Sequence, residues 1–382
     1  MIYFDNAATT YPKPEQVYSF MNQFYRECGV NVGRGQHDMA NRAYRLFAET
    51  KQLVKELLNC NDKEVVFTSS ATEALNVILQ GIKWDNDYTV YVSPFEHNSV
   101  MRVLYYLQDA YKINIKQLTV SKSTLLYDLE KIKYDFQENR PDVVVASHAS
   151  NVCGLIAPIK EICILAKEYN AVTVIDMAQT AGLIPTNLSD IEVDFAVFAG
   201  HKMLYGGFGI GGIIMNSSVG VKPLIYGGTG IDSASRTMPE TIPERYEAGS
   251  HNIQAIAGLN AALKWIMGIG VENIYAKEKE YTKRLVETIS EFSNINLVGY
   301  KDNESNIGVI SCVFDGYSSD NIGQVLNEQE IAVRTGLHCA PIAHKYLGTF
   351  PDGTVRFSVG YFNTDEDLRK LKNTLDYIEL NG

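Results

Sequence analysis

The sequence predicts an α/β protein, with a large domain built on a mostly parallel sheet and a smaller α+β domain packed against it. Two observations support this fold class. Over the first two thirds of the chain, short apolar runs alternate with helical periodicity, which is typical of strands covered on both faces by helices. Beyond about residue 268 a long charged helix is followed by strands separated by further helices.

The predicted elements of the large domain follow one another in a regular order. Apolar residues at three- and four-residue steps predict two leading helices, at 14–28 and 39–59. Short β-rich runs predict strands at 64–68, 89–92, 142–147, 172–175 and 194–198, with helices such as 72–81 and 158–169 between them.

The smaller domain begins with the charged helix, which we place at 271–292. Strands are predicted at 307–314 and 354–359, separated by a helix at 319–327, and a helix at 364–380 closes the domain. No segment rich in Pro, Gly or Ser separates the two parts, so we expect them to be in firm contact.

The charge balance argues against several classes of partner. The chain carries 45 acidic and 34 basic residues, giving a net charge of −11, so we expect no binding to nucleic acid or to an anionic membrane. No apolar stretch approaches the roughly 20 residues of a membrane span, and the first residues lack the features of a secretory signal. We therefore expect a cytoplasmic protein.

The six cysteines form no C-x-x-C pair, so neither a disulfide framework nor a metal site is predicted. They are Cys28, Cys60, Cys153, Cys163, Cys312 and Cys339. We expect most of them to be small buried hydrophobic residues, with Cys339 as the exception argued below.

Polar residues follow all five predicted strands of the large domain. They lie at 68–72, 96–98, 148–151, 176–179 and 199–202. Taken singly, a histidine such as His97 is more often a surface or structural residue, and a lysine such as Lys202 is usually a solvated charge. Because ligands bind at the carboxyl ends of strands in open α/β sheets, their joint placement predicts a functional site.

Three of these groups together describe a site for pyridoxal 5′-phosphate. The run from Ser70 to Glu73 opens a helix, whose free N–H groups stabilise a phosphate, although the same residues also fit an ordinary helix cap. Asp176 ends a strand, where a carboxylate can hold a proton on a heterocyclic nitrogen. Lys202 ends the next strand, where an amine can form a Schiff base with a carbonyl.

A dinucleotide-binding fingerprint is present but lies in the wrong context. The run GFGIGG at 207–212 satisfies G-x-G-x-x-G, yet it leads into the apolar strand at 213–215 instead of opening a helix after a strand. We therefore set nucleotide binding aside.

Seven short motifs occur along the chain in this order: YFDNAATT at 3–10, SATEA at 70–74, EHN at 96–98, D-x-x-Q at 176–179, GHK at 200–202, EAGS at 247–250 and RTGLHC at 334–339. In this order they resemble the class V aminotransferase group that contains the cysteine desulfurases and selenocysteine lyases. The resemblance covers nearly the whole chain. It implies the PLP fold type I, with a large domain at 15–266 and a small domain formed by 1–14 and 267–382.

The resemblance implies a role for each residue that would touch the cofactor ring. Lys202 corresponds to the Schiff-base lysine and Asp176 to the partner of the pyridine nitrogen. Gln179 corresponds to the donor to the ring oxygen. His97 corresponds to the imidazole that stacks on the cofactor face, and we count it with the catalytic residues.

Other positions correspond to ligands of the phosphate and the substrate. Ala71, Thr72 and His201 match the phosphate end of the cofactor, and Ser250 matches a residue that reaches the phosphate of the partner subunit, which implies a homodimer. Asn151 and Arg356 match positions that hold the substrate, and an arginine can grip its carboxylate with two hydrogen bonds.

Cys339 matches the residue on which the family forms a persulfide. Its nucleophilic form is the thiolate, which nearby positive charge favours, and Arg334 and His338 are close in sequence. A buried structural cysteine is the alternative. The short segment between Arg334 and the strand at 354 resembles the desulfurase subgroup with a compact catalytic loop.

The sequence therefore predicts a PLP-dependent cysteine desulfurase that converts L-cysteine to L-alanine and passes sulfur to an acceptor, such as a protein. Open alternatives are a selenocysteine lyase, another class V enzyme (aminotransferase, epimerase or β-lyase), and a non-catalytic PLP-fold platform for sulfur transfer. The chain departs from the family at Ala199 and Leu337 and in the loop at 203–207, which is one residue longer. These departures bear on the substrate rather than on the fold.

Overall fold

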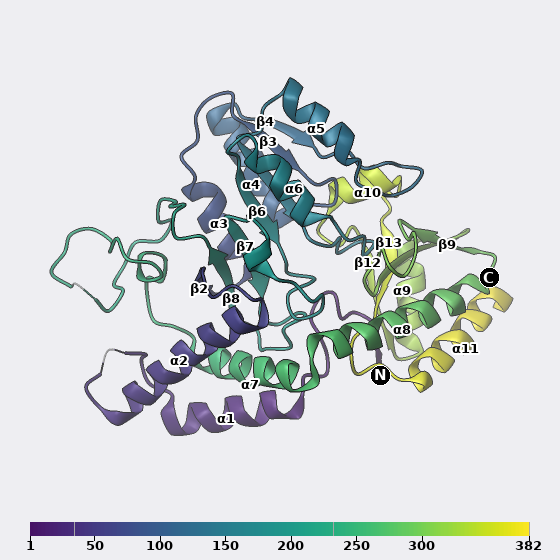
Figure 1. Ribbon diagram of the computed structural model, residues 1–382. Coiled ribbons are helices and arrows are strands. Elements are labelled where there is room, and N and C mark those ends of the chain that lie inside the picture. Colours follow the sequence, from purple (N-terminus) through teal and green to yellow (C-terminus); the bar gives the residue numbers. More distant parts are fainter. Residues whose placement is uncertain (34, 232, 382) are drawn as a thin grey trace.

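The computed structural model describes residues 1–33, 35–231 and 233–381, and within them the largest sheet has seven strands (Figure 1). In spatial order they are β2 (Glu64–Thr68), β8 (Gly211–Met215), β7 (Phe195–Ala199), β6 (Val172–Asp176), β5 (Val143–Ser147), β3 (Thr89–Val92) and β4 (Asn114–Gln117). Strand β8 is antiparallel to both of its neighbours, and the remaining pairs are parallel. The prediction of a mostly parallel sheet is confirmed.

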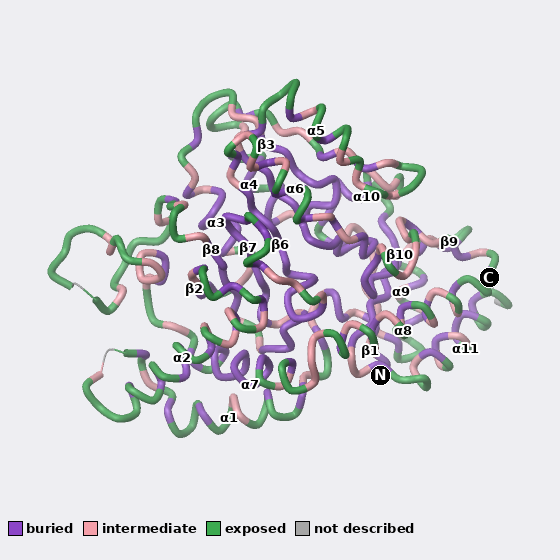
Figure 2. The backbone as a smooth tube through the Cα atoms, viewed as in Figure 1, coloured by how far each residue is buried: buried purple, intermediate pink, exposed green. Residues whose placement is uncertain are grey.

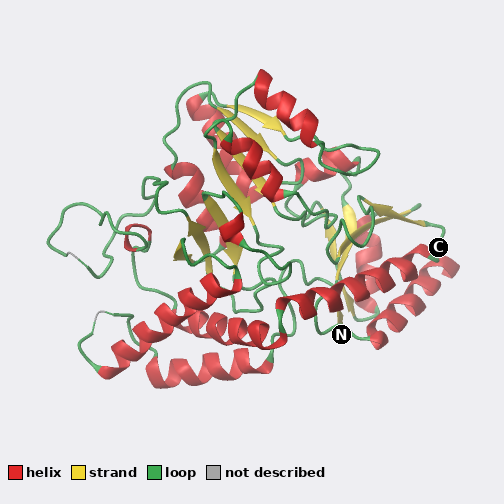
Figure 3. Ribbon diagram, in the orientation of Figure 1, coloured by secondary structure: helices red, strands yellow, loops and turns green. Residues whose placement is uncertain are grey.

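Helices cover both faces of this sheet (Figure 3). They are α1 (Glu15–Cys28), α2 (Asp38–Leu57), α3 (Ala71–Gly81), α4 (Asn98–Tyr111), α5 (Leu129–Glu138), α6 (Ile159–Lys167) and α7 (Ile253–Ile269). Successive strand residues point to opposite faces, so Val144 joins the core formed with α1, α2, α5, α6 and α7, while Val143 and Val145 join the core under α3 and α4. The central strands β5 and β7 are accordingly buried at every residue (Figure 2), whereas the edge strand β4 has no buried residue.

The remaining part of the chain builds an antiparallel sheet in the order β12 (Arg334–Gly336), β13 (Thr354–Ser358), β10 (Val309–Phe314) and β9 (Ile295–Val298). Helices α8 (Val271–Ser290), α9 (Ser319–Glu328), α10 (Pro341–Leu347) and α11 (Asp365–Asn381) accompany it (Figure 1). This is the α+β organisation that the sequence predicts.

The amino-terminal segment crosses to this second sheet. Strand β1 (Ile2–Tyr3) pairs in parallel with β11 (Ile331–Ala332), and Phe4 is fully buried in the same core. The contact agrees with the placement of residues 1–14 beside 267–382, although the domain boundaries themselves stay predictions.

Four helices, α4, α5, α7 and α10, are absent from the sequence prediction. Helix α7 shows the reason, because eleven of its seventeen residues are buried and it therefore lacks the polar stripe that reveals helical periodicity. Among the described residues no single helix is long and apolar enough to cross a membrane, although α7 and α8, bent by 81°, pass that test as a pair.

Candidate active site

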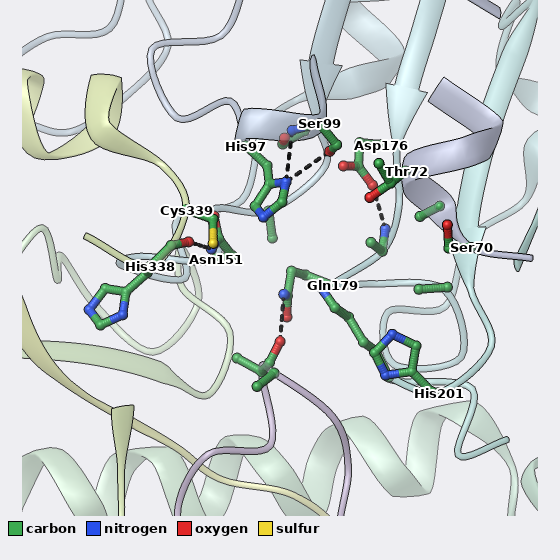
Figure 4. Close-up of a pocket in the computed structure, with 18 of the residues that line it drawn as sticks. Ser70, Thr72, His97, Ser99, Asn151, Asp176, Gln179, His201, His338 and Cys339 are labelled. Atoms are coloured by element: carbon green, nitrogen blue, oxygen red, sulfur yellow. Dashed lines mark hydrogen bonds between the residues drawn. The ribbon is translucent and has the colours of Figure 1, made fainter. Parts of the chain in front are cut away.

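A pocket of about 220 Å³ lies at the carboxyl ends of the parallel strands and is closed on one side by the second sheet (Figure 4). Of the predicted site residues, it brings together Ala71, Thr72, His97, Asn151, Asp176, Gln179, His201, Lys202, Cys339 and Arg356. Ser250 is not among them; it is exposed on the loop before α7. The N-terminal segment also reaches the pocket, through Ala7 and Ala8.

Asp176 is the last residue of β6, and Lys202 lies in the turn that follows β7, three residues after its end, in line with the strand pattern. The Asp176 carboxylate accepts a hydrogen bond from the Ala178 amide at 2.8 Å, while burial raises the pKa of Asp176. Burial lowers the pKa of Lys202 to about 8, an effect that the charge of Asp176 partly offsets. Lys202 therefore has an appreciable fraction of neutral amine near neutral pH, which is the nucleophilic form.

His97 caps the amino terminus of α4. Its Nδ1 accepts a hydrogen bond from the Ser99 amide at 3.1 Å and lies 2.8 Å from the Ser99 hydroxyl. Burial, with the charges of Lys202 and Arg334, lowers the pKa of His97 to about 4. The imidazole is thus neutral at physiological pH and suited to stack on a flat ring.

The start of α3 forms one end of the pocket. Ser70 caps this helix by accepting from the Glu73 amide at 3.1 Å, so the ordinary capping role is present, yet Ala71 and Thr72 also line the pocket. Gly211 on β8 makes this approach possible: a Cβ there would lie 2.6 Å from the Ser70 carbonyl carbon and 2.7 Å from the Ala71 nitrogen.

Two of the predicted cofactor ligands in the pocket each have a buried polar atom without a hydrogen-bond partner among the described residues. These atoms are Nδ1 of His201, whose ring stacks on Phe208 at 4.6 Å, and Oε1 of Gln179. The Gln179 amide nitrogen donates to the Ala7 carbonyl at 2.9 Å. These atoms share the pocket with the start of α3, a strand-end aspartate and a buried lysine, a combination that fits a phosphorylated heterocyclic aldehyde such as pyridoxal 5′-phosphate.

Cys339 is the one exposed cysteine; the other five are buried, as predicted. Its backbone and that of His338 have positive φ angles, +58° and +46°. Two hydrogen bonds, both of 2.7 Å, hold this turn against the loop after β5 and the start of α4. The side-chain amide of Asn151 donates to the His338 carbonyl, and the backbone amide of Asn98 donates to the Cys339 carbonyl. The thiol is therefore presented to the pocket by a fixed turn.

Arg334 lies beside the thiol, but His338 does not contribute positive charge. The Arg334 guanidinium is 3.8 Å from the Cys339 sulfur. The His338 ring points away from the pocket (Figure 4), pairs with the Thr354 hydroxyl at 2.8 Å, and is buried near Arg356, which together with burial lowers its pKa to about 2. The expectation that a charged His338 favours the thiolate is wrong, because the turn directs the two neighbouring side chains apart.

Arg356 is a buried residue of β13, in the second sheet. One terminal nitrogen donates to Asp5 at 2.6 Å and the other to the Asn151 carbonyl at 2.9 Å, while Nε has no partner among the described residues. The guanidinium is thus held rigidly with N–H groups to spare. The sequence analysis gave Asp5 no role, although it lies within the first of the seven motifs.

No group of three or more His, Cys, Asp or Glu side chains within residues 1–33, 35–231 and 233–381 has the arrangement of a metal site.

Residues 2–371 match the family model described as aminotransferase class-V. The chain belongs to this family. Curated relatives include a probable cysteine desulfurase of Methanothermobacter thermautotrophicus, which is 30% identical over 99% of this chain and 94% of the relative. Another, from Pyrococcus abyssi, is 31% identical over 98% of this chain and 94% of the relative.

Solved structures of family members have the same architecture. The apo cysteine desulfurase of Thermococcus onnurineus superposes with a TM-score of 0.91 at 27% identity, covering 100% of this chain and 95% of the other. A cysteine desulfurase of Escherichia coli superposes with a TM-score of 0.85 at 26% identity, covering 99% of this chain and 94% of the other. The predicted PLP fold type I is therefore confirmed.

Proposed function

We propose that this member of the class V family is a pyridoxal 5′-phosphate-dependent cysteine desulfurase, which converts L-cysteine to L-alanine and retains the sulfur as a persulfide on Cys339. One observation carries the proposal: the exposed thiol of Cys339, with Arg334 beside it, lines the same pocket as Lys202 and Asp176. An aminotransferase, epimerase or β-lyase needs the lysine and the aspartate but has no use for the thiol.

Several residues are suited to hold the cofactor. Asp176 would pair with the pyridine nitrogen, Gln179 with the ring oxygen, and His97 would stack on the ring. Ala71, Thr72 and His201, at the α3 end of the pocket, would bind the phosphate, and Ser250 would reach the phosphate of a partner subunit. When bound, the cofactor supplies an electron sink for a carbanion at the substrate Cα.

The protein side chains perform the remaining steps. Arg356 and Asn151 orient the substrate carboxylate, and the Lys202 amine takes the Cα proton. The Cys339 thiolate, with the Arg334 guanidinium beside it, attacks the substrate sulfur: a sulfur–sulfur bond forms as the carbon–sulfur bond breaks, and the substrate carbon takes up a proton to give alanine. The persulfide then passes to an acceptor, such as an acceptor protein.

The experiment that tests this proposal measures alanine and sulfide released from L-cysteine in the presence of a thiol reductant. Cys339→Ser and Cys339→Ala are expected to keep the bound cofactor but to lose alanine release by roughly a hundredfold or more, because a hydroxyl is far less nucleophilic than a thiolate. Mass spectrometry of the wild type after cysteine treatment is expected to locate the added sulfur on Cys339.

The buried Cys60 provides a control, since Cys60→Ala is expected to retain the activity. Cysteine turnover that persists in the Cys339 variants, or sulfur found on another cysteine, would refute the mechanism. Residual activity of Cys339→Ala on selenocysteine but not on cysteine would instead indicate a selenocysteine lyase, since the weaker C–Se bond needs no thiol attack. Cofactor binding without turnover of either amino acid would indicate a non-catalytic platform.

A further inference from the structure

Tyr205 connects the turn that bears Lys202 to the second sheet. It lies three residues after Lys202, and its amide donates to the Lys202 carbonyl at 2.8 Å. The side chain is 1% exposed, and the backbone has a φ of +54°, a conformation that costs free energy in a residue other than glycine. Surrounding contacts must therefore hold this residue in place.

The Tyr205 hydroxyl makes two hydrogen bonds to elements far away in the sequence. It donates to Oε1 of Glu278, on α8, at 3.0 Å, and it accepts from the Tyr361 amide at 3.0 Å. Tyr361 follows β13, the strand that carries Arg356. One hydroxyl thus links the chain segment of Lys202 to that of Arg356.

Aromatic packing keeps this link rigid. The Tyr205 ring lies 5.0 Å from Trp265 of α7 and 6.2 Å from Phe362, and the Trp265 and Phe362 rings stack at 5.7 Å. Such contacts leave little room for the hydroxyl to move away from its partners.

Glu278 is an unusual residue for this position. Its side chain is 2% exposed, no ion pair to it is found among the described residues, and burial raises its pKa to about 8. A buried acid and a strained tyrosine are both costly for folding, so their combination next to the Lys202 turn calls for a role in the site.

We propose that Tyr205 and Glu278 are positioning residues, which fix the Lys202 amine relative to the Arg356 guanidinium through the Tyr361 amide. The distance between the Lys202 amine and the Arg356 guanidinium determines whether one amino-acid substrate can contact both groups at once. The inference rests on the proposed roles of Lys202 and Arg356, and it assigns neither Tyr205 nor Glu278 any contact with the substrate.

The test compares Tyr205→Phe with Glu278→Gln and Glu278→Leu in the holoenzyme. Tyr205→Phe keeps the ring packing and loses both hydrogen bonds, so KM for L-cysteine is expected to rise about tenfold with a smaller effect on kcat. Glu278→Leu is expected to do the same. Glu278→Gln is expected to stay near the wild type, because a neutral amide oxygen accepts the same hydrogen bond.

Hydrogen exchange supplies a readout that does not depend on activity. In Tyr205→Phe the Tyr361 amide and the turn at 202–206 are expected to exchange faster than in the wild type. The control is Tyr91→Phe, because Tyr91 is equally buried and its hydroxyl also makes two hydrogen bonds, but to the carboxyl end of α5. It is expected to leave KM unchanged.

Faster exchange with an unchanged KM in Tyr205→Phe would overturn the proposal and leave a merely structural role. The same would follow if Tyr91→Phe raised KM equally, or if exchange at Tyr361 and the Lys202 turn did not change. A wild-type protein that releases no alanine from cysteine would refute the proposed function, whereas the exchange measurement would still decide whether Tyr205 links the two segments.

Discussion

Opposing effects set the chemistry of Lys202. Burial disfavours its charged form, and the negative charge of Asp176 favours it, so the pKa settles at about 8 rather than 10.5. Near neutral pH part of the amine is therefore cationic, which attracts the phosphate of pyridoxal 5′-phosphate. The rest is neutral, which is the form that attacks the aldehyde carbon.

This balance predicts how the cofactor-free protein reacts with pyridoxal 5′-phosphate. The rate is expected to rise with pH through about 8 and then level off, because the neutral amine is the attacking form. Asp176→Asn removes an attraction that raises the Lys202 pKa, so the midpoint is expected to move to lower pH. Stopped-flow absorbance from about pH 6 to pH 10 measures both curves.

Lys202→Ala serves as the control and is expected to give no such reaction. A wild-type midpoint near that of a free lysine, or a shift to higher pH in Asp176→Asn, would contradict this account of the site.

The turn that bears His338 and Cys339 shows which features of single residues the sequence could not predict. The position of Cys339 in the RTGLHC motif was predictable, and its exposure agrees with a nucleophile. The direction of His338 was not predictable, because the positive φ angles of His338 and Cys339 and the bond from His338 to Thr354 appear only in the folded chain. The Asp5 partner of Arg356 was equally hidden, since the two residues are distant in sequence and meet only in the folded chain.

Among the strands, β8 determines how the phosphate end is shaped. It runs against its neighbours, and its first residue, Gly211, lies under the start of α3. The alternation of strands and helices predicted the sheet and the convergence of the strand ends. It did not predict the reversed direction of β8, since direction depends on the connections and not on the apolar pattern.

Gly211→Ala is expected to weaken binding of pyridoxal 5′-phosphate by about tenfold or more. The added Cβ meets backbone atoms of Ser70 and Ala71 at 2.6–2.7 Å, so the start of α3 must shift away from the pocket. Fluorescence titration of the cofactor-free protein measures the affinity. The control is Gly220→Ala, where an added Cβ meets nothing within 4 Å, and an equal loss there would refute the explanation.

The N-terminal segment and β13 are joined by the ion pair between Asp5 and Arg356, whose arginine side chain is 2% exposed. Asp5→Ala leaves a buried cation without its partner and is expected to lower the free energy of unfolding by about 3 kcal/mol. Urea denaturation measures the change. Glu366→Ala removes the partner of Arg369 in an ion pair more than 70% exposed, and no measurable change is expected there.

For the molecule as a whole, the exposed position of Ser250 accords with a partner subunit at the phosphate. We expect the cofactor-loaded protein to be a homodimer, and Ser250→Ala to retain less cofactor on dilution because one phosphate hydrogen bond is lost. Sedimentation with absorbance detection of the bound cofactor measures both. An active monomer that keeps its cofactor at working concentration would contradict the prediction.

Parallel pairing of β1 with β11 dictates an order of events during synthesis. Ile2 lies opposite Ile331, so at roughly 5–20 residues per second the second strand leaves the ribosome roughly 15–65 s after the first. Throughout that interval β1 has no strand to pair with and Asp5 has no Arg356, although Gln179, the partner of the Ala7 carbonyl, has already been made. The last strand of the seven-stranded sheet, β8, is synthesised long before β11. The emerging chain therefore has an unfinished pocket, which only its last hundred residues complete.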